Sequence, residues 1–379
     1  MTQHRDRDRL RVLHVITTGD RRGAEMFAAD LIRALARDGV DQRVAVLRGS
    51  VPLAAGYEAP IDILSSTRTD LIPGLRIDPR VGWALRSICR RWQPHVVQAH
   101  GGEPFKYVAL AARRRNRIVY RRIGLSAERA TRRVSSRVYR LLMRRCRTIV
   151  AVAEAVRRET IDVFGVSEHR VVTIPRGVDP HRLRPLVGKE ASRRRLGIAA
   201  DAPVVLSLGA LSWEKDPLAH LEVMEGVRRQ LPGSVHLIAG DGPLRQEVEQ
   251  HAHLSGVDGL ARILGNRSDV GDLLAAADVL LLASRMEGMP GCLIEAGMSG
   301  VPVVSYAIAG VPEVVVHGTT GYLVDPGDVG GLVSRTIELL VAPSLRARMG
   351  GAARDRCRAA YDINVVAPKY RAIYEEARR

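Results

Sequence analysis

This chain of 379 residues has few aromatic residues, no closely spaced cysteine pairs and no long apolar runs. The last two of these shortages each exclude a class of protein. The four cysteines, Cys89, Cys146, Cys292 and Cys357, stand far apart and form no CxxC pair, so neither a zinc site nor a disulfide framework is expected. No apolar run reaches the roughly 18 residues that a membrane-spanning helix needs. The polar segment 1–9 predicts no secretory signal peptide. Together these shortages favour a protein of the reducing cytosol.

Negative charge is in short supply only in the first half of the chain. The net charge is +17, from 58 Lys and Arg against 41 Asp and Glu, and the whole excess lies within residues 1–180. Its densest stretch runs from Arg113 to Arg147. Such a basic region suits nucleic acid, anionic lipid or an acidic substrate, whereas codon bias toward arginine would explain the composition without any function. Both interpretations stay open at this point.

Apolar residues are abundant, at 46% of the chain, which is enough for two full cores. The length suits two domains of about 150–200 residues. Short apolar runs alternate with helical repeats, from Leu10–Thr17 through Arg170–Ile174 and again from Pro203–Leu208 onward. Alternation of this kind predicts parallel sheets with helices on both faces.

A cluster of prolines and charges interrupts this alternation between Pro175 and Pro185. Such a cluster is typical of a linker between domains. The fold class predicted is therefore α/β, with two doubly wound Rossmann-like domains at 1–180 and 181–360.

Glycine-bearing loops follow five successive predicted strands of the second half. In open α/β sheets, ligands bind beyond the carboxyl ends of the strands, and packing alone rarely requires glycine in every such loop. The sequence therefore predicts a ligand site at this edge. The loops are 209–215 (GALSWEK), 240–243 (GDGP), 265–266 (GN), 284–291 (SRMEGMPG) and 309–313 (AGVPE).

The loop 284–291 leads into a predicted helix and is the most informative of the five. Pro290 and Gly291 suit a helix start, because proline lacks the N–H group that is unpaired there. The backbone N–H groups of Gly291, Cys292 and Leu293 would then lie at the positive end of the helix, which favours an anion such as a diphosphate.

Three charged residues complete this predicted site. Lys215 can supply a cation to the diphosphate, and the Glu295 carboxylate can accept two hydrogen bonds from a diol such as ribose. Glu287 precedes the helix, where a transferred sugar would lie. The alternative is that both glutamates only favour the start of the helix through its dipole.

Residues Val205 to Asp325 resemble the nucleotide-sugar domain of the retaining glycosyltransferases of family four, which have the GT-B fold. The first half resembles the same family at 22–25 (RGAE) and 171–179 (VVTIPRGVD), so the resemblance covers most of the chain. In the second half it rests on Glu214-Lys215, on 240–244 (GDGPL), on E-x7-E from Glu287 to Glu295, on 300–304 (GVPVV), on 310–313 (GVPE) and on Gly321.

The resemblance implies two Rossmann-like domains that face a cleft, with a C-terminal helix at 361–379 crossing back to the N-terminal domain. It implies a hexosyltransferase that retains the anomeric configuration, works without a metal ion or cofactor, and uses a UDP- or GDP-linked sugar. The expected mechanism is leaving-group stabilisation with same-face attack, without a covalent glycosyl-enzyme. The N-terminal domain would read the acceptor.

The resemblance also assigns residues. The catalytic group would be His100, Glu287 and Lys215, although His100 can equally be a strand-end histidine with a structural hydrogen bond. No metal ligands are implied. The donor would be bound by Gly23, Lys215, Gly242, Asn266, Glu287, Gly288, Met289, Pro290, Gly291, Cys292, Leu293 and Glu295.

Three positions depart from the family pattern. Ala210 stands where a second cation for the diphosphate is common, and Arg176 or Arg285 are candidates to replace it. The segment 120–124 (YRRIG) lacks the histidine often seen there. Ala153 replaces a helix-opening serine.

The acceptor is not readable from the sequence. A lipid-linked or cell-envelope glycan acceptor would suit a basic N-terminal domain that docks on the inner face of the cell membrane, as in polysaccharide biosynthesis. Two other functions stay open: a sugar-nucleotide epimerase, and a basic nucleic-acid-binding protein, which lacks a recognisable recognition helix or stacking platform. The Asp6-Arg7-Asp8 tripeptide lies in a charged tail and is not expected to bind a metal.

Overall fold

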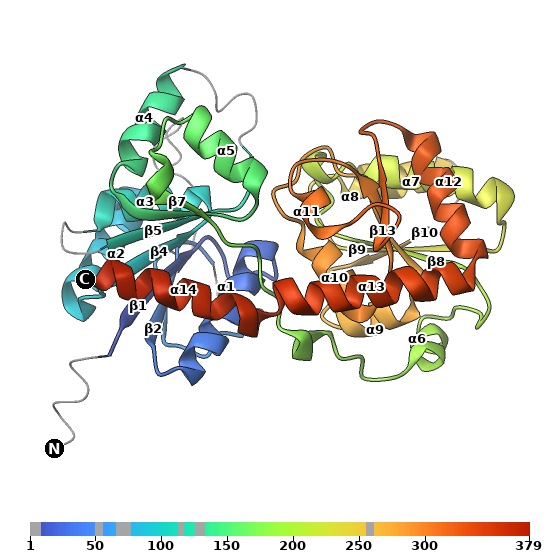
Figure 1. The fold of residues 1–379 in the computed structure, drawn as a ribbon, viewed down its shortest axis with the longest axis horizontal. Coiled ribbons are helices and arrows are strands. Elements are labelled where there is room, and N and C mark those ends of the chain that lie inside the picture. The colour runs from blue at the N-terminus through green and yellow to red at the C-terminus, as the bar shows by residue number, and fades with distance from the viewer. Residues whose placement is uncertain (1–8, 50–55, 66–76, 113–116, 126–132, 255–260) are drawn as a thin grey trace. The chain divides into compact units, whose positions relative to one another are not determined.

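The computed structural model describes residues 9–49, 56–65, 77–112, 117–125, 133–254 and 261–379. The chain divides into two compact units (Figure 1). Unit 1 comprises Met1–Gly177 and Ile363–Arg379, and unit 2 comprises Val178–Asp362. The tripeptide at Asp6 and part of the basic stretch from Arg113 to Arg147 lie outside the described residues. In the described parts of the chain, no helix is long and apolar enough to span a membrane.

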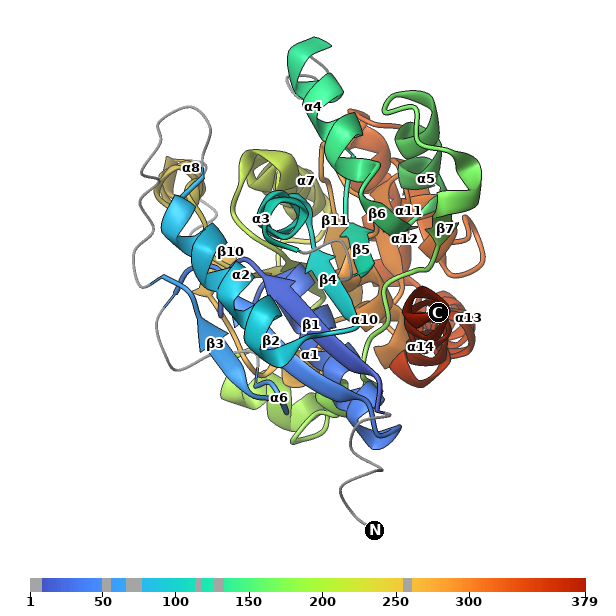
Figure 2. The same cartoon turned by 90° about the vertical axis from the view of Figure 1, so that its left-hand side faces the viewer.

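Unit 1 is built on a seven-stranded parallel sheet in the order β3-β2-β1-β4-β5-β6-β7 (Figure 2). The strands are β1 (Arg11–Ile16), β2 (Asp41–Val46), β3 (Ile61–Ile63), β4 (Val96–His100), β5 (Arg117–Arg122), β6 (Cys146–Ala151) and β7 (Val171–Thr173). The helices are α1 (Gly23–Arg37), α2 (Pro79–Trp92), α3 (Gly102–Ala111), α4 (Arg133–Met143), α5 (Glu154–Asp162) and α14 (Ile363–Arg378). Helices α1 and α14 pack together, as do α2 and α3, and right-handed crossovers put these two pairs on opposite faces of the sheet.

Helix α14 ends the chain but belongs to the core of unit 1. Tyr374 is fully buried, and its hydroxyl donates to Gln98 Oε1 on β4. The C-terminal helix thus returns to the N-terminal domain, as the sequence predicts. Its buried residues Ile363, Val366, Ala367, Tyr370 and Tyr374 pack in one cluster with Val12, Phe27, Leu31, Val96 and Val119.

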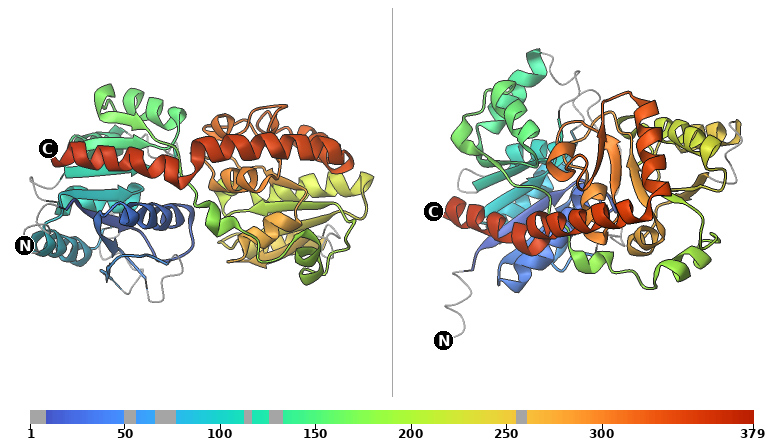
Figure 3. Two further views of the ribbon diagram at one scale, coloured as in Figure 1. Left: turned by 60° about the horizontal axis from the view of Figure 1, so that its bottom comes forward. Right: turned by 45° about the vertical axis from the view of Figure 1, so that its right-hand side comes forward.

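Unit 2 holds a six-stranded parallel sheet in the order β10-β9-β8-β11-β12-β13. Figure 3 shows this sheet with helices beside it. The strands are β8 (Val204–Leu208), β9 (Val235–Ala239), β10 (Ala261–Gly265), β11 (Val279–Leu282), β12 (Val303–Tyr306) and β13 (Gly321–Val324). The helices are α6 (Lys189–Arg195), α7 (Pro217–Gln230), α8 (Arg245–Leu254), α9 (Val270–Ala276), α10 (Gly291–Ser299), α11 (Val311–Val314), α12 (Val329–Val341) and α13 (Pro343–Tyr361). Helix α7 packs against α12, and α10 packs against α13 and α9.

The strand order of unit 2 reverses between β8 and β11. Strand β8 pairs with β9 on one side and with β11 on the other. The chain first adds strands outward from β8 through β9 to β10, and then returns to β11 and adds strands outward through β12 to β13. Ligands of open α/β sheets bind at such a reversal, outside the carboxyl ends of the strands. A ligand site is therefore expected at the loops after β8 and β11.

Candidate functional site

Backbone and side-chain hydrogen bonds tie the loops that follow β8 and β11 to each other. The N–H groups of Arg285 and Met286 both donate to the Glu214 carbonyl, at 2.9 and 3.2 Å. The Arg285 side chain also donates from Nε to Asp216 Oδ2 at 2.6 Å. These bonds fix the segment around Lys215 relative to the segment that precedes Glu287.

This arrangement brings together Lys215, which is predicted to contact a diphosphate, and Glu287, which is predicted to contact a transferred sugar. Lys215 Nζ lies 2.5 Å from Glu287 Oε1. Glu287 is 8% exposed, so its charge is largely removed from water and is matched by the lysine. The pair therefore presents one orientable cation and one orientable carboxylate at the strand reversal.

His220, on α7, forms hydrogen bonds with both of these loops. The sequence did not predict this role. His220 Nδ1 lies 3.0 Å from the Asp216 carbonyl oxygen, and the Ala283 N–H donates to its Nε2 at 3.1 Å. Because Nε2 accepts a hydrogen bond, the ring is neutral with its proton on Nδ1. Burial lowers the pKa of His220 to about 4, which keeps this form at neutral pH. A single histidine on an amphipathic helix gives no sequence signal for such a role.

Buried neutral histidines make the stability of the protein depend on pH. Burial lowers the pKa of His14 and His220 to about 4 and that of His236 to about 3, from 6.5. Between pH 6.5 and about 4 the unfolded chain therefore binds more protons than the folded one. Their contribution to stability is complete above pH 6.5 and is lost as the pH falls, by up to about 1.4 kcal/mol per pH unit for each histidine.

We expect urea unfolding at pH 7 and pH 5 to give a clearly smaller free energy of unfolding at pH 5. The variant His220→Gln should lower stability at pH 7 but reduce the difference between the two pH values, because one titrating group is gone. An unfolding free energy that stays constant from pH 7 to 5 in the unsubstituted protein would contradict the expectation.

Helix α10 begins where the sequence predicts an anion-binding helix. Pro290 is its N-cap residue, with φ −71° and ψ 120°, and Gly291 is its first residue. Proline therefore stands one position earlier than predicted. It offers no side-chain acceptor to the first N–H groups, so the N-cap leaves the positive end of the helix open to an anion. Gly288, Met289 and Leu293 are buried and Cys292 is half-buried. Backbone N–H groups rather than side chains are therefore expected to contact an anion here.

Glu295 lies in the second turn of α10 and has a partner that the sequence did not reveal. Arg182 Nη2 donates to Glu295 Oε1 at 2.8 Å, and both side chains are mostly buried. Arg182 comes from a short 3₁₀ turn, Pro180–Leu183, 113 residues earlier in the chain. Its guanidinium orients the carboxylate that is predicted to hold ribose.

Two other predicted donor residues lie in the loops after β9 and β10. A Cβ on Gly242 would collide with the Leu211 carbonyl, so close packing of the loops after β8 and β9 already accounts for this glycine. Asn266 is exposed and follows β10, the edge strand two places from β8.

Gly23 is the predicted donor residue at the start of α1 in unit 1. A Cβ on Gly23 would lie 2.9 Å from Arg176 Nη1. The buried guanidinium of Arg176 therefore lies beside the amino end of α1. Arg176 is one of the two candidates for the cation that is missing at Ala210. It lies next to Gly23, the glycine that is predicted to contact the donor.

His100 ends β4 and belongs to a buried chain of hydrogen bonds. Its Nε2 lies 3.1 Å from His14 Nδ1, and His14 Nε2 lies 3.0 Å from Gln42 Oε1. Gln42 donates its amide to the Ile32 carbonyl at 2.8 Å, so its oxygen must face His14. The proton positions follow: His14 carries hydrogen on Nε2, and His100 donates from Nε2, which leaves His100 Nδ1 as a lone-pair acceptor.

Burial, together with His14 and Arg121, holds the pKa of His100 well below its usual range. His100 is therefore a neutral imidazole at physiological pH rather than a general acid. The network gives His100 the structural hydrogen bond that the sequence offered as the alternative to a catalytic role. It also leaves His100 Nδ1 able to accept one further hydrogen bond.

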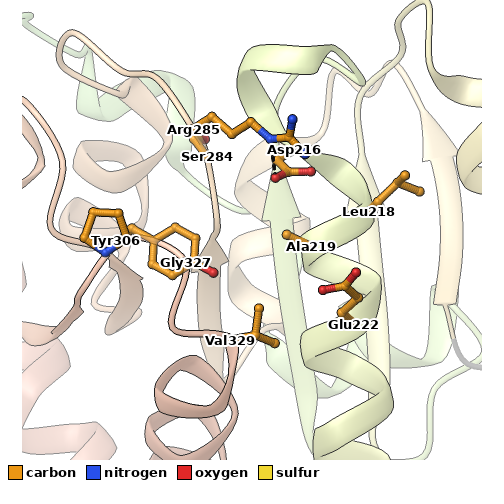
Figure 4. A pocket seen from close by; sticks show the side chains of 10 residues that line it. Asp216, Leu218, Ala219, Glu222, Ser284, Arg285, Tyr306, Gly327 and Val329 are labelled. Carbon is orange, nitrogen blue, oxygen red and sulfur yellow. Dashed lines mark hydrogen bonds and ion pairs between the residues drawn. The ribbon is translucent and has the colours of Figure 1, made fainter.

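A pocket of about 520 Å³ adjoins the tied loops (Figure 4). It lies between α7 and the start of α12, and its walls include Asp216, Glu222, Ser284, Arg285 and Tyr306. It contains none of the predicted donor residues. In the described ranges of the chain, no three His, Cys, Asp or Glu side chains come together as metal ligands would.

Comparison with known proteins gives two family matches that meet near the boundary of the two units. A family model described as glycosyl transferases group 1 matches residues 188–356, and one described as glycosyltransferase family 4 matches residues 21–182.

Curated relatives are similar over part or most of the chain. N-acetyl-alpha-D-glucosaminyl L-malate synthase of Bacillus anthracis is 34% identical over 143 residues, a match that spans 38% of either protein. The lipopolysaccharide core biosynthesis glycosyltransferase LpsE of Rhizobium meliloti is 28% identical over 86% of this chain and 88% of its own.

Solved structures share the fold. The crystal structure of Anabaena HepE in complex with UDP and glucose superposes with a TM-score of 0.83 at 19% identity, covering 97% of this chain and 99% of that one. WaaG, a glycosyltransferase involved in lipopolysaccharide biosynthesis, superposes with a TM-score of 0.77 at 17% identity, covering 96% of this chain.

Proposed function

Because the chain belongs to the group 1 glycosyltransferases with the GT-B fold, we propose that it transfers a sugar from a UDP- or GDP-linked donor with retention of configuration and without a metal ion. The observation that carries this proposal is the convergence of Lys215, Glu287 and the uncapped start of α10 at the strand reversal of unit 2. The complex of HepE with UDP and glucose is consistent with it. Neither an epimerase nor a nucleic-acid-binding protein has a counterpart among these matches.

The donor diphosphate would lie between Lys215 and the amino end of α10. As the glycosidic bond breaks, negative charge builds on the phosphate, and a fixed cation with fixed N–H groups stabilises that charge. These groups can supply the positive charge that other transferases take from a metal ion. Arg182 would hold Glu295 in position to accept hydrogen bonds from the ribose hydroxyls.

Glu287 would hold hydroxyls of the donor sugar rather than attack its anomeric carbon. Its carboxylate is already paired with Lys215 at 2.5 Å, which lowers its reactivity as a nucleophile. The proposal is therefore same-face attack by the acceptor on a sugar whose leaving group is stabilised, with no covalent intermediate. His100 Nδ1 is placed by its network to accept one hydrogen bond, in a positioning role.

Calorimetry with UDP, GDP and their sugar conjugates, in the presence of EDTA, tests the donor. One nucleotide should bind without added metal, and NMR of the product should show the anomeric configuration of the donor. If no nucleotide binds, or if binding requires Mg²⁺, the donor site is wrong. Conversion of the donor sugar to an epimer without an acceptor would favour the epimerase alternative.

We also propose that unit 1 docks on the anionic inner face of the cell membrane and reaches a lipid-linked or cell-envelope glycan acceptor there. Helix α4 exposes Val138 and Leu141, at 53% and 63%, beside exposed Arg137 and Arg144. Apolar side chains flanked by arginines suit a headgroup region, where each basic residue contributes about 1 kcal/mol.

Sedimentation with vesicles that contain anionic lipid, at low salt, tests this surface. The unsubstituted protein should pellet, and Leu141→Asp should pellet less. Leu254→Asp changes an exposed leucine of unit 2 and should behave like the unsubstituted protein. Failure of the unsubstituted protein to pellet would overturn the membrane proposal and leave the donor site unaffected.

A further inference from the structure

A second pocket lies wholly within unit 1, at the carboxyl end of β5. Its volume is about 250 Å³, and nothing in the donor site contributes to it. Tyr120 and Arg122 are two residues apart on β5 and so face the same side of the sheet. Tyr139 and Met143 are one helical turn apart on α4, and Gly102 is the first residue of α3. Three elements therefore direct side chains or backbone into one space.

The polar end of this pocket contains two tyrosine hydroxyls without protein partners. Tyr120 is 4% exposed, and its ring stacks on Phe105 with centroids 4.1 Å apart, which fixes the direction of its hydroxyl. No residue in the described parts of the chain forms a hydrogen bond with the hydroxyl of Tyr120 or Tyr139. Each hydroxyl is therefore available to donate a hydrogen bond to a ligand in the pocket.

The two hydroxyls converge on the amino end of α3. A Cβ built on Gly102 would lie 3.6 Å from Tyr139 Oη and 3.7 Å from Tyr120 Oη. The N-cap of α3 is Gly101, which provides no side-chain acceptor for the first N–H groups of this ten-residue helix. Glycine at 102 leaves a small volume open between the helix start and both tyrosines.

This end of the pocket has a buried guanidinium, which is held in place by an ion pair. Arg122 is 3% exposed, and its Nη1 donates to Thr160 Oγ1 at 2.8 Å while Nη2 pairs with Glu159. Its guanidinium also lies over the Phe164 ring, 4.5 Å from the centroid. Burial raises the pKa of Tyr120 and Tyr139, so both remain O–H donors at physiological pH.

Hydrogen-bond donors thus dominate one end of the pocket, and apolar side chains form the other. Among the described lining residues there is no Asp or Glu, and Ile123, Met143 and Phe164 provide the remaining wall. The tyrosine hydroxyls can also accept hydrogen bonds, but the guanidinium and the first N–H groups of α3 only donate, which favours a ligand rich in acceptors over a neutral sugar. A carboxylate or phosphate attached to an apolar body satisfies both ends.

We propose that this pocket binds the acceptor through an anionic group, a carboxylate or a phosphate, that is joined to an apolar moiety. The assignment of the ligand as the acceptor rests on the proposed glycosyl transfer, whereas the binding itself does not depend on a donor. Tyr120, Tyr139 and the amino end of α3 donate to the anion beside the Arg122 guanidinium.

Two variants separate binding from folding. Gly102→Ala places a methyl group in the volume between the hydroxyls at ordinary van der Waals distances, and it favours the helix, so the melting temperature should stay the same or rise. Tyr120→Phe removes only a hydroxyl that has no partner and should not lower the melting temperature. Gly330→Ala, in the first turn of α12 of unit 2, is the matched control.

The probes are phenyl phosphate, benzoate and the neutral benzyl alcohol, each titrated by calorimetry into the full chain without nucleotide. At least one anion should bind and benzyl alcohol should not, and the stronger anion identifies phosphate or carboxylate chemistry. Gly102→Ala and Tyr120→Phe should each weaken binding of that anion at least tenfold, with Gly330→Ala unchanged.

The outcomes distinguish this inference from the proposed function. Absence of binding by both anions, or binding that persists unchanged in Gly102→Ala, overturns the inference even if a nucleotide binds to unit 2. Anion binding that Gly102→Ala abolishes, in a protein that binds no nucleotide, supports the pocket and overturns the transferase proposal instead.

Discussion

Replacement of Lys215 by methionine is expected to lower kcat/KM for the donor by about a hundredfold to a thousandfold. Removal of one group that stabilises developing negative charge has an effect of this size in other enzymes. Methionine keeps most of the apolar stem of lysine, so packing of the loop changes little. The loss should be measured as hydrolysis of the donor sugar nucleotide in the absence of an acceptor.

The single substitution has one complication, because it leaves the Glu287 carboxylate buried without its cation. Loss of a partner in a buried pair destabilises a protein strongly. The double variant Lys215→Met with Glu287→Gln removes both charges and should recover the melting temperature but not the rate. Lys369→Met makes the same exchange at an exposed lysine of α14 and should leave both quantities unchanged. Full activity in the double variant would show that the pair is structural.

Replacement of Glu295 by alanine is expected to weaken binding of the preferred nucleotide by about a hundredfold. Hydrogen bonds to a charged group are worth about 1.5–3 kcal/mol each, and each 1.4 kcal/mol is a factor of ten in affinity. The substitution also leaves Arg182 without the carboxylate that it contacts at 2.8 Å. The melting temperature of the free protein must therefore be measured beside the affinity.

A 2′-deoxy nucleotide makes this test specific for the ribose. The unsubstituted protein should bind the deoxy form more weakly than the ribonucleotide, and Glu295→Ala should bind the two forms about equally, because the contact is already lost. Glu338→Ala, which removes a half-buried glutamate of α12 that pairs with Arg335, should keep the preference for ribose. If Glu295→Ala retains the same preference, Glu295 does not contact the sugar of the nucleotide.

Much of the fold was predictable because parallel strands buried on both faces leave continuous apolar runs. The runs predicted at Leu10–Thr17 and Pro203–Leu208 form strands β1 (Arg11–Ile16) and β8 (Val204–Leu208). Strand β13 (Gly321–Val324) and strand β3 (Ile61–Ile63) were not predicted, because β13 begins with a glycine and β3 is partly exposed, so neither leaves a continuous apolar run. The linker prolines marked the boundary at 180, and the two units meet in the chain at 177 and 178.

The partners of the site residues were not predictable in the same way. The pair of Lys215 with Glu287 spans 72 residues, and the pair of Arg182 with Glu295 spans 113. No local period links residues so far apart. His220 and His14 gave no signal for their networks, since an isolated histidine looks the same whether it is solvated or buried.

The sequence by itself determined the alternation of strands and helices, the glycine loops at one edge of each sheet, and the residue types for a diphosphate, because each depends on neighbours within one turn or one strand. The tertiary structure decided which charges meet, which histidines stay neutral, and which glycines are required by close packing. It also placed Tyr120, Tyr139 and Gly102 around one small volume. Those outcomes depend on burial and on contacts between distant segments, which exist only when the sheets have formed and their loops have been brought to a common edge.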